Sequence, residues 1–149
     1  MIPRSALALG LAGLLPFFFG VVTLLSPALR EMTEGLIGPR FTGPYVLISY
    51  GSVILSFMSG VLWGFAARGE MEHRWRGYAL STVPALWVFF MVGGGPSQAL
   101  SALFIGFVGL LRLDWQFRVW GLAPEWWMRL RLILTAGVVL CLALGLWLG

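Results

Sequence analysis

Residues 44–67 read PYVLISYGSVILSFMSGVLWGFAA, a run that contains no charged residue. The hydrocarbon core of a bilayer is about 30 Å thick, and a helix needs around 20 apolar residues to cross it. The run meets that length, so it predicts a transmembrane helix. The whole chain has the same character, since 59% of its residues are hydrophobic and only 11% are charged. Soluble domains carry about 25% charged residues, so the composition predicts a protein that lies in lipid.

Four further apolar stretches lead to an all-α fold, with the whole chain forming one polytopic helical membrane bundle (residues 1–149). We expect about five transmembrane helices, with short interfacial helices in the loops. The predicted spans lie at approximately 5–25, 44–67, 77–92, 97–111 and 130–148. The third and fourth are short and are separated by Gly93-Gly94-Gly95-Pro96, which cannot continue a helix. These two either cross as an antiparallel pair or form a re-entrant hairpin, which would leave three crossings.

The basic residues, all arginines, are distributed unevenly between the two ends of these spans. With five crossings, eight arginines lie on the side of the N-terminus and two on the other side: Arg4, Arg68, Arg74, Arg76, Arg112, Arg118, Arg129 and Arg131 against Arg30 and Arg40. Positively charged loops stay in the cytoplasm. The sequence therefore predicts a multi-pass protein of the bacterial inner membrane, with a cytoplasmic N-terminus and a periplasmic C-terminus. Arginines in short loops beside apolar runs indicate contact with anionic lipids, not nucleic acid.

The loops carry acid–arginine pairs spaced four residues apart, such as Glu70 with Arg74 and Asp114 with Arg118. Such pairs face each other on a helix turn, so we expect the loops to form short surface helices. Ser26-Pro27 has the pattern of a helix start. The loop before the last span is rich in indoles, which prefer the headgroup level. It is predicted to lie flat on the membrane as a lipid contact or partner-docking surface through Trp115, Trp120, Trp126 and Trp127.

Side chains that could carry out catalysis, move ions or bind a metal are scarce in this sequence. We expect no ionisable residue within the spans, which weighs against ion-coupled transport because such proteins place one near the midplane. The spans have serines but no base at their depth, so we expect a non-enzymatic protein. His73 is expected to be solvated, and the single cysteine, Cys141, has no partner for a disulfide or metal site. No cofactor and no metal are expected.

Small residues recur at helical spacing along two spans. Such rows let another helix approach closely, so we interpret them as packing grooves and expect residues 44–67 to form the centre of the bundle. Pro16 and Pro84 are expected to kink their helices. The predicted grooves consist of Ser52, Ser56, Gly60 and Gly64 in the second span and Gly137, Cys141 and Gly145 in the fifth.

Several motifs resemble those of a family of uncharacterised membrane proteins. These are the run Tyr50–Phe57 with Trp63-Gly64, the run Leu80–Leu86, and Leu113-Asp114 followed by Pro124–Trp127 and Leu130–Thr135. The opening Ile2-Pro3 to Pro16-Phe17 fits as well. Together they resemble the domain-of-unknown-function family 3429, the transmembrane protein 69-like family of small inner-membrane proteins, over nearly the whole chain.

The resemblance implies a compact multi-span protein of a bacterial or mitochondrial inner membrane and supplies no reaction. Within the matched motifs, the positions to test are Trp63, Asp114, Trp126 and Arg131. Asp114 at a span end is expected to anchor an arginine of the last helix and so hold the fold. Many members of the family have a histidine before the Trp-Gly pair, where this chain has Leu62, so any role of that histidine does not carry over.

Three functions remain open at this point. The first is a non-enzymatic accessory or assembly component of a larger membrane complex, such as a respiratory complex, with a membrane-protein partner or a homo-oligomer. The second is a small channel or carrier for a neutral solute, and the third is lipid-headgroup binding through Arg129 and Arg131. Hydroxyl and amide side chains that would line a channel are Ser49, Ser52, Ser56, Ser59, Ser81, Thr82, Gln98 and Ser101.

Overall fold

The computed structural model describes residues 1–149 and is helical throughout, as the composition predicts. One short 3-10 helix, η1, lies between the third and fourth α-helices. The elements are α1 (Arg4–Ala12), α2 (Leu15–Leu25), α3 (Pro27–Ile37), η1 (Pro39–Phe41), α4 (Gly43–Ala67), α5 (Met71–Ser81), α6 (Val83–Met91), α7 (Pro96–Val119) and α8 (Trp127–Leu148).

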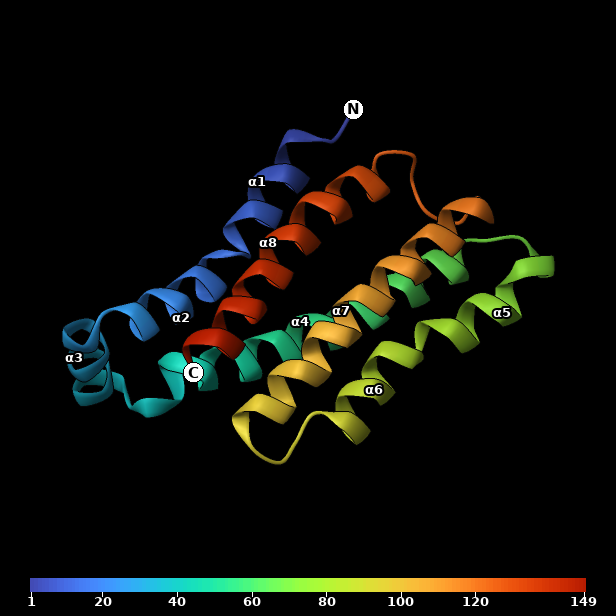
Figure 1. Cartoon of the computed structure of the whole chain (residues 1–149). Coiled ribbons are helices and arrows are strands. Elements are labelled where there is room, and N and C mark those ends of the chain that lie inside the picture. Colours follow the sequence, from blue (N-terminus) through green and yellow to red (C-terminus); the bar gives the residue numbers. More distant parts are fainter.

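Four helical segments are long and apolar enough to cross a membrane: Arg4–Leu25, which combines α1 and α2, and α4, α7 and α8. In Figure 1, α5 and α6 follow each other as one further rod, the third in chain order, which returns antiparallel to α4 and α7. The pair spans Met71 to Met91, about 30 Å at 1.5 Å per residue. The expectation of about five membrane helices in a bundle is therefore met by these four candidate spans and by the rod that α5 and α6 form.

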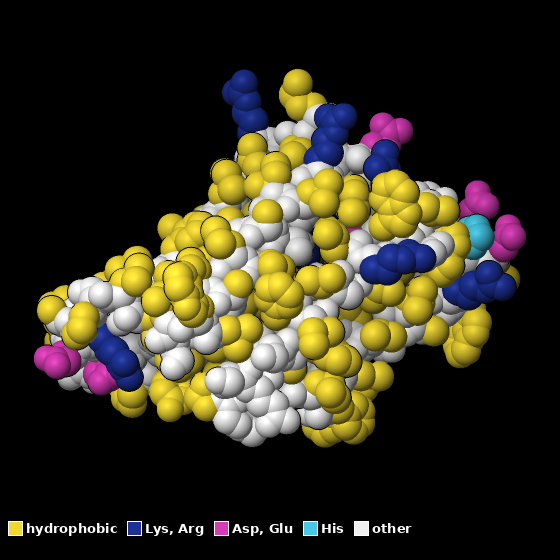
Figure 2. Space-filling model, viewed as in Figure 1, with side chains coloured by type: hydrophobic (Ala, Val, Ile, Leu, Met, Phe, Trp, Pro, Cys, Tyr) yellow, Lys and Arg dark blue, Asp and Glu magenta, His cyan; other side chains and the backbone are white.

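The turns divide between two ends of this bundle. The N-terminus, the α4–α5 turn and the α7–α8 connection lie at one end, and α3, the α6–α7 hairpin and the C-terminus lie at the other (Figure 1). Dark-blue arginine side chains gather at the first end in Figure 2, whereas the second end shows an arginine beside acidic side chains. The loops assigned to one side from the sequence therefore do lie together, and we refer to the first end as the arginine-rich end.

α4 occupies the centre of the bundle, as expected from its length and small residues. It packs against α2, α5, α6, α7 and α8. Its inward face carries Leu47, Leu55 and Leu62, all fully buried. Phe17 of α2 and Phe107 of α7 close the core around them with edge-to-face rings 6.3 Å apart.

The interruption of the third rod falls where the sequence places Pro84. Proline disrupts the hydrogen-bond ladder of a helix, so neighbouring groups have to satisfy the freed backbone donors. Here the hydroxyl of Ser59, which is buried on α4, accepts a hydrogen bond from the backbone N–H of Ala85 at 2.8 Å. This hydrogen bond therefore links the third rod to the central helix at the point where the rod is interrupted.

The first loop forms the predicted short helix. Ser26 caps α3, since its hydroxyl accepts the N–H of Leu29 at 3.3 Å. Arg30 and Glu34 form the expected pair four residues apart, at 3.0 Å, and Thr42 donates to Glu34 as well. Both contacts lower the pKa of Glu34 from its usual value, the hydrogen bond from Arg30 contributing most.

Two predictions about the other loops are wrong. α7 does not end near residue 111 but continues to Val119, and α8 begins at Trp127, so no flat helix lies between these spans. α5 likewise runs from the second loop directly into the third span. Of the acid–arginine pairs, only Arg30–Glu34 forms within 4.0 Å, because Asp114 is drawn into the interior and Arg74 bonds the Gly69 carbonyl oxygen at 2.8 Å.

The contact between α2 and α4 depends on the absence of a side chain at Gly20. A Cβ there would lie 2.8 Å from Val46 Cγ1 and 2.9 Å from Leu47 Cδ2. We expect Gly20→Val to destabilise the protein by about 1–3 kcal/mol through overpacking, measured as a lower unfolding temperature in mild detergent. Gly64→Val is the matched control, because nothing lies within 4 Å of a Cβ at Gly64. Equal unfolding temperatures for the two variants would contradict this packing.

Candidate functional site

A buried ion pair joins the ends of α7 and α8 near the arginine-rich end. Asp114 is fully buried and Arg131 is 3% exposed. The Arg131 Nε donates to one carboxylate oxygen at 3.0 Å, and the indole N–H of Trp127 donates to the other at 2.9 Å. Asp114 therefore anchors an arginine of the last helix, and the tryptophan completes the set.

This cluster corrects the expectation that the spans hold no ionisable residue. Asp114 lies five residues before the end of α7, and Arg131 lies four after the start of α8. Each is about 6–8 Å from its helix end at 1.5 Å per residue, so the pair is close to the arginine-rich end and away from the midplane. The sequence did not show that α7 extends past Asp114, because Arg112 marked the end of the apolar run.

A groove of about 670 Å³ runs beside this pair, between α1–α2, α4 and α8. Arg68 and Trp126 line it at the arginine-rich end, and Leu14, Phe17 and Val138 line its inner part. Pockets for small molecules typically measure 300–1,000 Å³. This groove could not be predicted from the sequence, because it depends on how α1 and α2 bend relative to α8.

Polar groups in the groove are few and gather at one end. The Tyr50 hydroxyl donates to the Gly13 carbonyl oxygen at 3.0 Å and is thereby satisfied. The Nη2 of Arg131 is buried and has no hydrogen-bond partner. Arg68, which caps the C-terminus of α4, is exposed and lines the same groove as Arg131.

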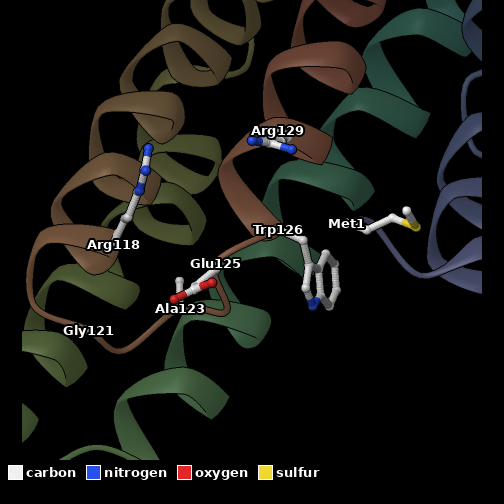
Figure 3. Close-up of a pocket in the computed structure, with 7 residues that line it drawn as sticks. All are labelled: Met1, Arg118, Gly121, Ala123, Glu125, Trp126 and Arg129. Atoms are coloured by element: carbon white, nitrogen blue, oxygen red, sulfur yellow. The ribbon is translucent and has the colours of Figure 1, made fainter.

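A second hollow, of about 640 Å³, lies outside the bundle at the same end. Figure 3 shows Arg118 on α7 and Arg129 on α8 at its two sides, with Glu125 and Trp126 on the connection between them. Arg129 is exposed here, whereas Arg131 faces the interior. Residues two apart on a helix do not share a face, so the predicted pairing of Arg129 with Arg131 in one headgroup site is wrong.

The other tryptophans predicted as an interface or lipid contact each pack against a different partner. Trp63 is half exposed and packs on Tyr78, with ring centroids 4.4 Å apart. Trp115 is exposed beneath the guanidinium of Arg118 at 5.3 Å. Trp120 stacks on His73 at 5.5 Å, so this histidine, expected in solvent, is half buried. No common indole surface results.

The two rows of small residues have different surroundings. On α8, a Cβ at Gly137 would lie 2.9 Å from Leu14, one at Gly145 would lie 2.7 Å from Leu47, and Cys141 is buried. On α4, by contrast, Gly60 and Gly64 have nothing within 4 Å of a Cβ. The small residues of α8 therefore pack within the chain, and the predicted groove on α4 is not filled within the chain.

Four of the hydroxyls considered for a channel have partners inside the chain, Ser59 through its bond from the Ala85 N–H. Ser52 donates to the Ile48 carbonyl oxygen, Ser81 to Tyr78, and Thr82 to Ala79, all at 2.7–2.8 Å. None of these three lines either large hollow. No group of three or more His, Cys, Asp or Glu side chains is arranged to hold a metal ion.

An all-helical bundle whose helices are long and apolar enough to span a bilayer, with one buried ion pair, defines a multi-pass integral membrane protein. Residues 2–147 match the family described as "Protein of unknown function (DUF3429)". The chain belongs to this family, as its motifs indicated.

Transmembrane protein 69 of Xenopus tropicalis is 34% identical over 144 residues, which cover 94% of this chain and 53% of the relative. The chain thus spans about half the length of the curated relative it matches. No solved structure matches the chain.

The buried pair generates a prediction about stability. Asp114→Ala leaves the guanidinium of Arg131 buried without its counter-charge, and breaking such a pair costs about 3–5 kcal/mol. We expect a large fall in the unfolding temperature in detergent. The double variant Asp114→Leu with Arg131→Leu should recover most of it, because no buried charge remains.

Arg129→Leu, two residues away on the exposed face of α8, is the control and should leave the unfolding temperature nearly unchanged. The pair would not be coupled if the double variant lost as much stability as the single variants Asp114→Leu and Arg131→Leu lose when their effects are added.

Proposed function

We propose that the protein is a non-enzymatic accessory or assembly component of a larger membrane complex and binds a transmembrane helix of another protein. The observation that carries this proposal is the open small-residue face of α4. Ser56, Gly60 and Gly64 follow one another at intervals of four residues, and all are exposed. They form a shallow row on the outside of the helix that also organises the core.

The row has walls of larger side chains. Trp63 stands on one side and Val53 and Phe57 on the other, each at least 49% exposed. Glycines between larger residues let a second helix come close enough for backbone contacts, and such small-residue rows are common where membrane helices associate. Because no helix of this chain fills the row, a helix from another chain is the occupant that its shape fits.

The occupant proposed is a different protein and not a second copy. The setting that we propose is a larger membrane complex, such as a respiratory one. The alternative of a neutral-solute channel has less support, because Ser52, Ser81 and Thr82, which would line the path, donate to the backbone carbonyls of nearby residues in the chain.

A matched pair of glycine variants tests this proposal. Gly60→Leu fills the row without touching the rest of the chain, and Gly109→Leu makes the same change on α7, where a Cβ also has nothing within 4 Å. After purification of the tagged protein from its native membrane in mild detergent, we expect a stoichiometric partner with wild type and Gly109→Leu. Gly60→Leu should lose it. Recovery of the chain alone or as a homo-oligomer, or equal recovery of the partner with both variants, would reject the proposal.

We further propose that the arginine-rich end faces the cytoplasm of a bacterium and that the chain lies in its inner membrane. The clustering of exposed arginines at one end supports this orientation through the positive-inside rule. An alkaline phosphatase fused after Gly149 should be active, and a fluorescent protein that folds only in the cytoplasm should be dark at the same position. The opposite pair of signals would overturn the orientation.

A further inference from the structure

The groove beside the buried pair is open toward the surface that the membrane covers. Leu9 of α1 and Phe57 of α4 line it, and they are 75% and 61% exposed. A ligand can therefore enter from the side, out of the lipid phase. From Leu130 to Val138 the groove follows α8 for eight residues, about 12 Å, so it leads from the arginine-rich end toward the midplane.

The groups left free at the head of the groove are all cationic donors. Both oxygens of Asp114 are engaged, by Trp127 and by Arg131. The Arg131 Nη2 remains buried without a partner, and a buried polar group left unsatisfied costs about 1–3 kcal/mol. Since Arg131 is neutralised by Asp114, Arg68 supplies an uncompensated positive charge. A ligand that fits has to bring hydrogen-bond acceptors and negative charge.

We infer that this groove binds an anionic phospholipid, whose phosphate is held by Arg131 Nη2 and Arg68 and whose acyl chain lies along α8 among Leu130, Leu134 and Val138. The order of the lining decides for a lipid over a soluble anion. The cationic groups stand where headgroups lie, at the ends of α4 and α8, and the apolar groups stand where acyl chains lie. The groove shares Phe57 with the open face of α4, but the inference does not rest on the proposal that a partner binds to that face.

Lipid binding to the full-length protein tests the inference. The protein is stripped of lipid in mild detergent and titrated with phosphatidylglycerol or phosphatidylcholine of the same acyl chains, with native mass spectrometry as the readout. We expect one phosphatidylglycerol per chain, bound about tenfold more tightly than phosphatidylcholine, which corresponds to about 1.4 kcal/mol. Inorganic phosphate should not displace it, because phosphate makes none of the acyl-chain contacts.

Variants locate the site without removing the buried pair. Arg68→Gln should abolish the preference for phosphatidylglycerol, whereas Arg129→Gln, an equal loss of charge at the same end but outside the groove, should preserve it. Val61→Trp narrows the apolar part and should weaken both lipids. Equal binding of both lipids to wild type, an equal effect of the two arginine variants, or displacement by inorganic phosphate would overturn the inference.

Discussion

A charged group inside a membrane protein is tolerated only if an opposite charge and hydrogen bonds meet it there. The contact of Asp114 with Arg131 and Trp127 satisfies this condition and fixes the position of α8 relative to α7. α8 in turn packs on α1 and α2, so the bend of the N-terminal rod and the shape of the groove depend on the same pair. The two arginines at the head of the groove have different roles: Arg131 is locked by its counter-charge, and Arg68 is free to interact with a ligand or with lipid.

Composition and apolar run length were sufficient to predict the helical membrane bundle, because both follow directly from the thickness of the bilayer. The cap at Ser26 and the break before Pro84 were predictable for a similar reason, since each depends on the backbone of one or two residues. The end of α7 was not predictable in this way. Arg112, Asp114 and Arg118 interrupt the apolar run. A buried carboxylate at Asp114 is stable only because Arg131 on another helix pairs with it.

Prediction of the candidate sites was limited in the same way, because these sites depend on contacts between helices that lie far apart in the sequence. The role of Asp114 as an anchor was inferred from a motif, and the structure supplies the partner. The row from Ser52 to Gly64 was correctly seen as a row of small residues, but the sequence did not tell which side of α4 would be covered. The groove beside Arg131 was missed altogether, because its walls come from three separate parts of the chain and its orphaned nitrogen is visible only in three dimensions.

The rods differ in length, and this difference bears on the lipid around them. α4 has 25 residues and measures about 38 Å, which exceeds the bilayer core of about 30 Å. The third rod begins with charged residues in α5, so its apolar part, from Gly77 to Val92, measures only about 24 Å. Such hydrophobic mismatch is relieved by tilting the long helix and thinning the bilayer beside the short one. The protein is therefore matched to a thinner bilayer beside the third rod than beside its longer helices, and a gradient of bilayer thickness around it follows from the fold.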